Sequence, residues 1–256
     1  MTDRKAQILD IARRDGRVAV DALAISLGVS AHTIRRDING LCSDSLLRRL
    51  HGGAEYIDPP TNLPYATRAV LNYEAKLAIA AAAAEIVPDG ATVFLSIGST
   101  PALVAGALAH RRDLTLVTNN LNAAVALSDA EGARIILPGG EVRLPDRDFV
   151  GEEITDFFSA YRADFGIYGV GGIDDDGSLL DFHESEVRVR ERIRSCARTS
   201  ILVADRTKFG RGAVAVGGRL EDADHIVIDR RPDPRFAPLL EPLADKLILA
   251  EEPIHG

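Results

Sequence analysis

The apolar positions at the start of the chain recur with the period of an α-helix. They predict an amphipathic helix over residues 4–15, which ends at Gly16. A second, shorter pattern predicts a helix over residues 22–27, with Asp21 as its expected N-cap. Each predicted helix has one apolar face, so the two are expected to share a core.

A third helix is expected over residues 31–41. Gly28 ends the preceding helix, and Ser30 is a favourable N-cap for the next one. At roughly 100° per residue, the apolar side chains of this third helix fall on one side: Ile34, Ile38 and Leu41. Two short helices joined by a tight, glycine-containing turn form the core of a helix-turn-helix.

The opposite face of the third helix is polar. Its side chains are His32, Arg35, Arg36 and Asn39. Arginine suits guanine edges and phosphates, asparagine suits adenine, and histidine offers a donor or an acceptor. Ser30 and Thr33 lie near the positive end of the helix, where a phosphate is favoured. We predict that this face contacts DNA; the alternative is an ordinary solvated helix face.

Residues 46–54 predict a short β-hairpin beside these helices. Gly52 and Gly53 supply its turn. The hairpin also carries basic or neutral donors, namely Arg48, Arg49 and His51. A hairpin in this position is the wing of a winged helix-turn-helix, which adds a second contact to the DNA backbone. Alternatively, its arginines pair only with carboxylates of the same domain.

A proline-rich segment follows the predicted wing. Pro59, Pro60 and Pro64 disfavour a helix and favour an extended, semi-stiff spacer. The predicted organisation is therefore a winged helix-turn-helix over residues 1–57, a linker over 58–73 and a second domain over 74–256.

Helical and strand patterns alternate in the second domain. Helices are expected over 74–86, 102–109 and 183–196 and after Asn120, and strands over 92–95, 114–118, 134–137, 164–170 and 200–204. This alternation predicts an α/β domain with a mostly parallel sheet that is covered on both faces. In such sheets, ligands bind beyond the carboxyl ends of the strands.

One of these strand ends has the composition of a phosphate-binding turn. Gly98, Ser99 and Thr100 follow a strand and open a helix, with Pro101 expected at the first helical position. Glycine permits close backbone approach, the hydroxyls donate hydrogen bonds, and the helix N-terminus favours an anion. No lysine follows at the spacing of a Walker loop. An ordinary strand-to-helix turn would look similar.

Other strand ends add polar groups and glycines to the predicted ligand site. These are Asn119, Asn120, Gly139, Gly140, Gly171, Gly172, Asp205 and Lys208, joined by Glu186 on a helix. Lysine neutralises phosphate charge, and carboxylates accept hydrogen bonds from ligand hydroxyls. Alternatively, Asp205 only ends a strand and Glu186 pairs with Arg190 one helical turn away. The acidic run 174–177 is expected to be a β-turn rather than a calcium loop.

The distribution of charge fits a small DNA-binding head on an acidic body. The whole chain of 256 residues has 30 Lys and Arg against 38 Asp and Glu, a net charge of -8. Residues 1–55 hold 9 basic against 7 acidic residues, a net of +2. An acidic body discourages indiscriminate binding to phosphate chains, so only the head is expected to contact nucleic acid.

The sequence carries no sign of a metal site, a cofactor or a membrane segment. Cys42 and Cys196 lie outside any metal-ligand spacing and are expected to be reduced thiols. The charged N-terminus lacks the apolar region of a signal peptide, and no apolar run approaches the ~20 residues of a membrane span. We therefore expect a cytoplasmic protein with no metal, no cofactor and no membrane partner.

The head resembles that of the DeoR family of bacterial sugar regulators. The resemblance rests on residues 29–37 (VSAHTIRRD) and 49–54 (RLHGGA). It implies that the helix starting at Ala31 is the recognition helix and that the His-Gly-Gly segment is the wing. Relatives often carry glutamine where this chain has His32.

The body is similar to the DeoR-type effector domain over about residues 74–229. The matching runs are 97–101 (IGSTP), 117–122 (VTNNLN), 172–174 (GID), 177–182 (GSLLDF), 186–188 (EVR), 203–205 (VAD) and 208–211 (KFGR). The resemblance implies the ribose-phosphate isomerase and CoA-transferase fold. It also implies an inducer phosphate held by the loop 98–100, surrounded by Asn119, Glu186, Asp205 and Lys208. Two departures are Ser96, where many relatives have Asp, and His183-Glu184, where close relatives have Asp-Tyr.

The family resemblance implies a transcriptional repressor of carbohydrate or glycerol metabolism genes. It would leave its double-stranded operator on binding a phosphorylated inducer, glycerol 3-phosphate or a related sugar phosphate. Two adjacent half-sites require at least a dimer, and dimer and tetramer both remain open. The alternatives are an activator of the same family, or a sugar-phosphate isomerase-like enzyme in which Glu186 or Asp205 is the general base.

Overall fold

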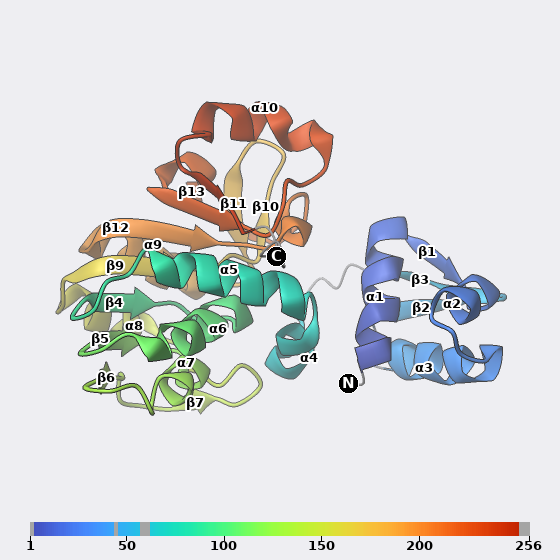
Figure 1. Cartoon of the computed structure of the whole chain (residues 1–256), viewed down its shortest axis with the longest axis horizontal. Helices are drawn as coiled ribbons and strands as arrows, with labels where there is room; N and C mark the ends of the chain where they lie inside the picture. Colours follow the sequence, from blue (N-terminus) through green and yellow to red (C-terminus); the bar gives the residue numbers. More distant parts are fainter. Residues whose placement is uncertain (1–2, 44–45, 57–61, 251–256) are drawn as a thin grey trace, which may run out of the picture. The chain divides into compact units, whose positions relative to one another are not determined.

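The computed structural model describes residues 3–43, 46–56 and 62–250. The chain divides into two compact units, Met1–Asn72 and Tyr73–Gly256. Each unit has its own apolar core, and each is described separately below (Figure 1).

The first unit combines helices with a small antiparallel sheet. Its elements are α1 (Asp3–Asp15), β1 (Arg17–Ala19), α2 (Val20–Ser26), α3 (Ala31–Ser43), β2 (Leu47–Leu50), β3 (Gly53–Tyr56) and α4 (Tyr65–Val70). The strand order is β1-β3-β2, so β3 lies between the wing strand β2 and the short strand β1. These elements confirm the predicted winged helix-turn-helix. Strand β1 was not predicted, because three residues are too few to show a strand pattern.

The core of this unit comes from the apolar faces that the helical period predicts. Ile8, Leu9, Ile34, Ile38 and Leu41 are all buried to within 1% of full burial. The start of α2 differs from expectation. The helix begins at Val20, and Asp21 lies in its first turn instead of capping it. A carboxylate in the first turn still faces the positive end of the helix dipole.

The predicted linker contains a helix. Residues 57–61, with Pro59 and Pro60, lie outside the described part of the chain. Pro64 occupies the N-cap position of α4, where its missing N–H costs no helical hydrogen bond. Asn72 follows with φ of 52°, a left-handed conformation that asparagine tolerates better than most residues. Part of the span 58–73 is thus helical instead of extended.

The second unit is a larger α/β domain. Its helices are α5 (Tyr73–Glu85), α6 (Ser99–Ala107), α7 (Leu121–Ala126), α8 (Glu152–Ser159), α9 (Glu184–Cys196) and α10 (Ala237–Leu240). Its strands are β4 (Thr92–Leu95), β5 (Thr115–Thr118), β6 (Arg134–Ile136), β7 (Val142–Arg143), β8 (Asp148–Phe149), β9 (Ala163–Tyr168), β10 (Gly172–Ile173), β11 (Ser178–Asp181), β12 (Ala197–Val203), β13 (Ala215–Arg219), β14 (His225–Ile228) and β15 (Leu247–Leu249). Short 3₁₀ turns span Leu108–His110, Arg206–Lys208, Leu220–Asp222, Pro234–Phe236 and Glu241–Leu243.

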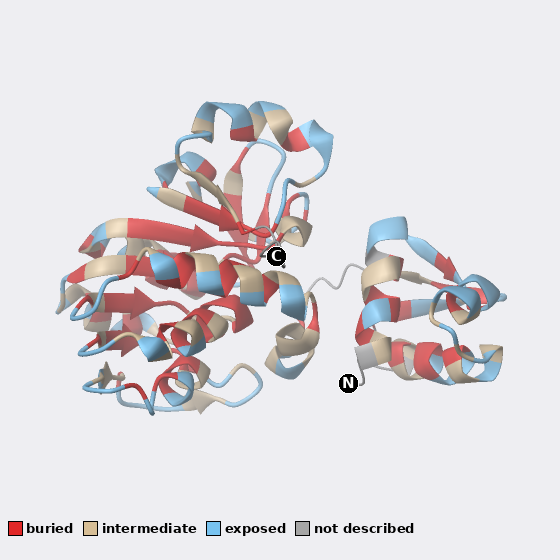
Figure 2. Ribbon diagram, viewed as in Figure 1, coloured by how far each residue is buried: buried red, intermediate tan, exposed pale blue. Residues whose placement is uncertain are grey.

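Within the described chain, seven strands form one fully parallel sheet in the order β15-β14-β12-β9-β4-β5-β6. Figure 1 shows α5, α6 and α7 on one face of the sheet. Side chains alternate along the strands, so Val93 and Leu95 join the core beneath these helices, whereas Phe94 joins the core with α8 and α9. The central strands are buried from both sides (Figure 2). This confirms the predicted parallel sheet.

Three smaller features complete the second unit. Strands β10, β11 and β13 form an antiparallel sheet, and β7 and β8 form a separate hairpin. Helix α6 begins at Ser99, so Pro101 is its third residue and not its first as predicted. Proline is accommodated there because the first four N–H groups of a helix have no partner within it.

Candidate functional site

Helix α3 presents the predicted polar face to its surroundings. Ser30 Oγ accepts a hydrogen bond from the Thr33 N–H at 3.2 Å and lies 2.9 Å from Thr33 Oγ1, which confirms Ser30 as the N-cap. Because Ile34 and Ile38 are fully buried, the opposite face is left exposed. The exposed side chains on it are His32, Arg35, Arg36 and Asn39.

Arg35 and Arg36 form no ion pair with any carboxylate in the described part of the chain. The one acidic residue of α3, Asp37, is buried and accepts from Arg4 Nε of α1 at 2.5 Å. The carboxylate of Asp37 therefore faces the core and pairs with Arg4, so it does not neutralise the arginines of the outer face. Two exposed positive charges remain on the outer face, where they suit a polyanion.

The wing supplies further basic groups, but some of them have internal partners. Arg48 and Arg17 both donate to Glu55, with Arg48 Nε 3.0 Å from Glu55 Oε2. These hydrogen bonds, chiefly that from Arg48, hold the pKa of Glu55 below its ordinary value. Arg49 donates to Asn39 Oδ1 of α3 at 2.9 Å, which ties the wing to this helix. His51 is exposed in the turn.

The carboxyl ends of the central strands bring most of the predicted ligand-site residues together. Since β12, β9, β4 and β5 are consecutive neighbours in the sheet, the loops that follow them share one edge. Asn120 Nδ2 donates to the carbonyls of Ser96 and Gly98 at 3.1 and 3.0 Å, and Ser96 Oγ accepts from the Gly169 N–H at 3.2 Å. Three of these loops are thus linked directly.

The turn at Gly98 leads into the N-terminus of α6. Gly98 has φ of 124°, which only glycine adopts without strain. Ser99 and Thr100 follow it as the first residues of the helix, and both are buried. The Cβ that Gly98 lacks would lie 3.2 Å from the Pro101 ring. The predicted glycine-hydroxyl turn therefore exists as a strand-to-helix turn with its N–H groups at the carboxyl edge of the sheet.

A lysine that the sequence reasoning missed lies at this turn. Lys76 of α5 is 4% exposed, and its Nζ donates to Ser99 Oγ at 3.1 Å. A buried ammonium group at a helix N-terminus concentrates positive potential on one spot. The available signal was the helical period, because Lys76 shares a face with the buried Ile79 and Ala80.

A second missed residue, Arg143, gathers acidic groups beside Asn119. Arg143 donates to Asp148 at 2.9 and 2.7 Å and to Glu186 of α9 at 3.1 Å. Glu186 therefore pairs with Arg143, and not with Arg190 as the structural alternative supposed. Asn119 Nδ2 donates to the carbonyl of Phe149, the residue after Asp148, at 2.9 Å. Burial raises the pKa of Asp148, and the Arg143 charge opposes that effect.

Gly171 lies in a buried polar network at the end of β9. Its N–H donates to Asp181 Oδ1 at 2.8 Å, and its carbonyl accepts from Arg211 at 3.1 Å. Asp181 also accepts from Arg190 at 2.9 Å. Burial raises the pKa of Asp181, whereas Arg190 and, more weakly, Lys208 act in the opposite direction. Lys208 directly precedes Phe209, which pairs with Ile173 of β10, and β10 follows the Gly171 loop.

No hydrogen bond among the described residues joins two further groups of predicted residues to the Gly98 turn. Asp205 is buried, and its Oδ1 accepts from the Thr207 N–H at 3.0 Å, which caps the turn Arg206–Lys208. This matches the structural reading of Asp205 as a strand terminator. Gly139 and Gly140 are exposed after the edge strand β6, and no hydrogen bond among the described residues links them to the Gly98 turn.

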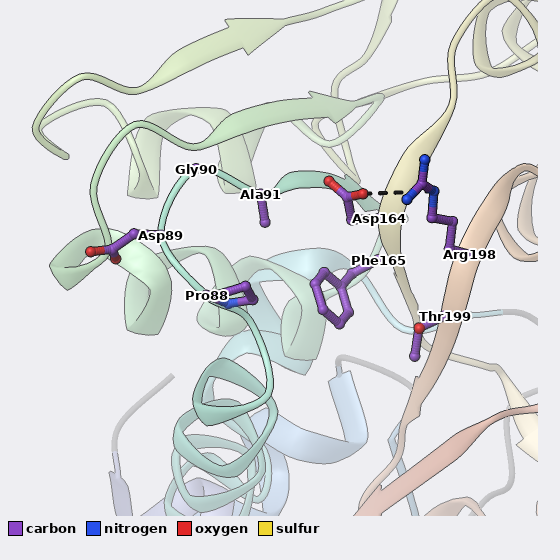
Figure 3. Close-up of a pocket in the computed structure, with 8 residues that line it drawn as sticks. All are labelled: Pro88, Asp89, Gly90, Ala91, Asp164, Phe165, Arg198 and Thr199. Atoms are coloured by element: carbon purple, nitrogen blue, oxygen red, sulfur yellow. Dashed lines mark ion pairs between the residues drawn. The ribbon is translucent and has the colours of Figure 1, made fainter.

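A surface hollow lies at the other end of the sheet (Figure 3). Its lining residues are Pro88, Asp89, Gly90, Ala91, Asp164, Phe165, Arg198 and Thr199. They precede or begin β4, β9 and β12, so the hollow is at the amino ends of these strands. Asp164 forms an ion pair with Arg198 at 3.9 Å and accepts a hydrogen bond from the Thr92 N–H at 3.0 Å. The hollow is thus separate from the predicted ligand site.

Two further sequence expectations concern ions and membranes. The run 174–177 forms a turn closed by a hydrogen bond from the Gly177 N–H to the Asp174 carbonyl at 3.0 Å. Over residues 3–43, 46–56 and 62–250, no group of three or more His, Cys, Asp or Glu side chains is arranged to hold a metal ion. None of the helices in the same ranges has the length and apolar character that a bilayer crossing requires.

Comparison with known proteins identifies both units. Residues 4–60 match the DeoR-like helix-turn-helix domain, and residues 71–230 match the DeoR C terminal sensor domain. The glycerol-3-phosphate regulon repressor of Escherichia coli (strain K12) is 42% identical over 231 residues, which cover 90% of this chain and 92% of that protein. The protein of the same name from Haemophilus influenzae is 40% identical over 230 residues, with 90% of each chain covered.

A solved structure of ribose 5-phosphate isomerase from Plasmodium falciparum is similar over 52% of each chain, at 18% identity and a TM-score of 0.37. The fold assignment rests on the strand order, not on this partial likeness. These two relatives, and a third from E. coli that is 34% identical over 97% of this chain, are named as repressors. Both matched domains and these relatives show that the chain belongs to the DeoR family of transcriptional regulators, in which a DNA-binding helix-turn-helix precedes a sensor domain.

Proposed function

We propose that this chain represses transcription as a homo-oligomer, binding an operator through α3 and the β2–β3 wing. A phosphorylated polyol, glycerol 3-phosphate or a related sugar phosphate, releases it. The observation that carries the effector part is the buried Lys76 ammonium on Ser99 at the N-terminus of α6. The names of the relatives from E. coli and H. influenzae support the choice of glycerol 3-phosphate.

The proposed site fits a phosphate monoester. The N–H groups at the start of α6, the hydroxyls of Ser99 and Thr100, and the Lys76 ammonium all favour an anion at one point. Lys208 adds a second positive charge beside β10, the strand that follows the Gly171 loop, because the next residue, Phe209, pairs with Ile173. Asn119, Glu186 and Asp205 are proposed to surround the ligand, because their loops or helices reach the same edge of the sheet.

The position of Lys76 in the chain suggests how the effector acts on the head. Helix α5 begins at Tyr73, directly after the boundary between the two compact units at Asn72. Lys76 is about one helical turn further on. A ligand that contacts Lys76 therefore acts on the first helix of the second unit, which directly follows the boundary in the sequence. Release requires that the ligand bind the DNA-free state more tightly than the DNA-bound state.

A mobility-shift titration tests the proposal. Operator DNA bound by the full chain is titrated with glycerol 3-phosphate and with a panel of sugar phosphates. We expect release of the wild-type protein. Lys76→Met and Lys208→Ala are expected to bind DNA normally but to need at least about tenfold more ligand, since each removes a charge partner of the phosphate.

Lys246→Met is the matched control. Lys246 donates to the Glu221 carbonyl, away from the proposed site, so this variant is expected to respond like the wild type. A wild-type complex that no phosphorylated compound dissociates would contradict the effector proposal. A Lys76→Met protein with a normal response would remove Lys76 from the site.

A further inference from the structure

Asn119 holds one buried hydrogen-bond acceptor without a partner. Its side chain is 1% exposed, and its Oδ1 has no hydrogen-bond partner among the described residues. Buried side-chain polar atoms are satisfied in the large majority of cases, so such an atom calls for an explanation. The other end of the same amide is satisfied, since Nδ2 donates to the Phe149 carbonyl at 2.9 Å.

The orientation of this amide is determined by its neighbour. A carbonyl oxygen only accepts hydrogen bonds, so the NH₂ group must face Phe149 and the oxygen must face away from it. If the amide were turned around, Asn119 Oδ1 would face the Phe149 carbonyl oxygen, which is also an acceptor. The NH₂ group would then lose its hydrogen bond to Phe149. The free acceptor is therefore a property of the fold and not of the choice of amide orientation.

The loop of Asn119 contacts the proposed phosphate turn directly. The next residue, Asn120, donates through Nδ2 to the Gly98 carbonyl at 3.0 Å and to the Ser96 carbonyl at 3.1 Å. On the other side, the Phe149 N–H donates to the Asn119 carbonyl at 3.0 Å. Asn119 thus lies between the α6 N-terminus and the β7–β8 hairpin that Arg143 ties to Glu186.

We propose that Asn119 Oδ1 accepts a hydrogen bond from a hydroxyl group of the effector. This inference rests on the proposed function, because it assumes a phosphate monoester at Ser99 and Lys76. It narrows the ligand class to esters that carry a hydroxyl group, since an ester without one leaves the acceptor unsatisfied. Asn119 is then a specificity-determining residue, and the α6 turn supplies affinity for the phosphate.

The geometry also gives a condition for binding. Asn119 Oδ1 is covered in this structure, and β8 pairs with the loop of Asn119 through the Phe149 N–H. A hydroxyl group reaches the oxygen only if the groups that cover it shift. The hydroxyl preference therefore belongs to the ligand-bound state.

Calorimetric titration of the full chain tests the inference with three probes: glycerol 3-phosphate, propyl phosphate, which has no hydroxyl group, and inorganic phosphate. We expect the wild type to bind glycerol 3-phosphate at least about tenfold more tightly than propyl phosphate, as a site built around a ligand hydroxyl does. In Asn119→Ala this ratio is expected to fall to within about threefold, mainly by loss of glycerol 3-phosphate affinity. The wild-type ratio does not depend on the folding of any variant.

Asn122→Ala is the matched control. Asn122 lies in the same segment and donates through Nδ2 to the Asp146 carbonyl of the same hairpin at 3.3 Å. It is expected to keep the wild-type ratio. Equal binding of glycerol 3-phosphate and propyl phosphate to the wild type, or an unchanged ratio in Asn119→Ala, overturns the role of Asn119 but leaves the proposed function intact. If neither these three probes nor any sugar phosphate of the mobility-shift panel binds, both the role of Asn119 and the effector proposal are overturned.

Discussion

Arg35 and Arg36 are exposed on α3 beside Asn39, and no described carboxylate neutralises them. We expect Arg35→Ala and Arg36→Ala each to weaken operator binding by about 1–3 kcal/mol, because each removes a charge-assisted contact to a base or a phosphate. Quantitative mobility shifts at fixed salt measure the effect.

Arg14→Ala is the control for these two variants. Arg14 is also an exposed arginine of the head, but it lies on α1 and pairs with its neighbour Asp15 at 2.7 Å. Its loss should change operator affinity little. If Arg14→Ala and Arg35→Ala weaken binding equally, a diffuse positive charge and not the α3 face accounts for the affinity.

Among the described residues, Arg143 is the cation that pairs with both Asp148 and Glu186. We expect Arg143→Met to destabilise the sensor domain by about 3–5 kcal/mol at pH 7, since removing one partner leaves buried carboxylates unpaired. Urea unfolding measures this loss. Arg147→Met, on the same hairpin but exposed, should be near neutral.

The destabilisation caused by Arg143→Met should also depend on pH. Burial already raises the pKa of Asp148 with Arg143 present, and the pKa rises further once the guanidinium is gone. A carboxyl group whose folded pKa is raised destabilises the fold above that pKa and ceases to do so as pH falls through it. The difference between Arg143→Met and the wild type should therefore shrink as the pH is lowered from 7 through the acid range. A constant difference over this range would show that the carboxylates are not the cause.

The site residues that the sequence predicted differ from those that it missed in one respect, namely the separation along the chain between each residue and its hydrogen-bond partner. Ser30 caps α3 through Thr33, three positions away, and this pairing follows from local patterns. Lys76 meets Ser99 across 23 residues, and Arg143 meets Glu186 across 43. Neither pairing was derivable from local periodicity, because it depends on which strands become neighbours in the sheet.

At the scale of secondary-structure elements, the central strands and long helices were predictable because each buries a continuous apolar stretch. Strand β4, for example, begins and ends where the buried run 92–95 does. Strands β7, β8 and β10 have only two residues each, too few for an alternating pattern to show. Helix α4 was not predicted, because the prolines that precede it favour an extended chain and the whole span 58–73 was predicted as a linker.

Gly172 tests how strand β10 is held in place. A Cβ at this position would lie 1.9 Å from the Arg211 carbonyl oxygen, so a methyl group must displace backbone. We expect Gly172→Ala to lower the free energy of unfolding by about 1–3 kcal/mol or more, as overpacking does. Gly212→Ala is the matched control, because nothing lies within 4 Å of its added Cβ and its φ is not in the left-handed region. Equal stability of the two variants in urea would show that β10 adjusts without cost.

At the scale of the whole molecule, a small head of net positive charge is joined to an acidic sensor domain. A single head of this size contacts only one half-site. The proposed homo-oligomer places a second head on the DNA, and the two contacts then reinforce each other only if both half-sites face the protein.

Operator spacing tests this arrangement. Half-sites on one face of B-DNA are about 10 base pairs apart or a multiple of that distance. Inserting about 5 base pairs between them rotates one half-site to the far side of the duplex, whereas inserting about 10 base pairs restores the face. We expect the half-turn insertion to weaken binding far more than the full-turn insertion in mobility shifts with the full chain. If each chain binds its half-site independently, both insertions will leave the affinity at each half-site unchanged. That result would contradict the proposal that a homo-oligomer binds both half-sites at once.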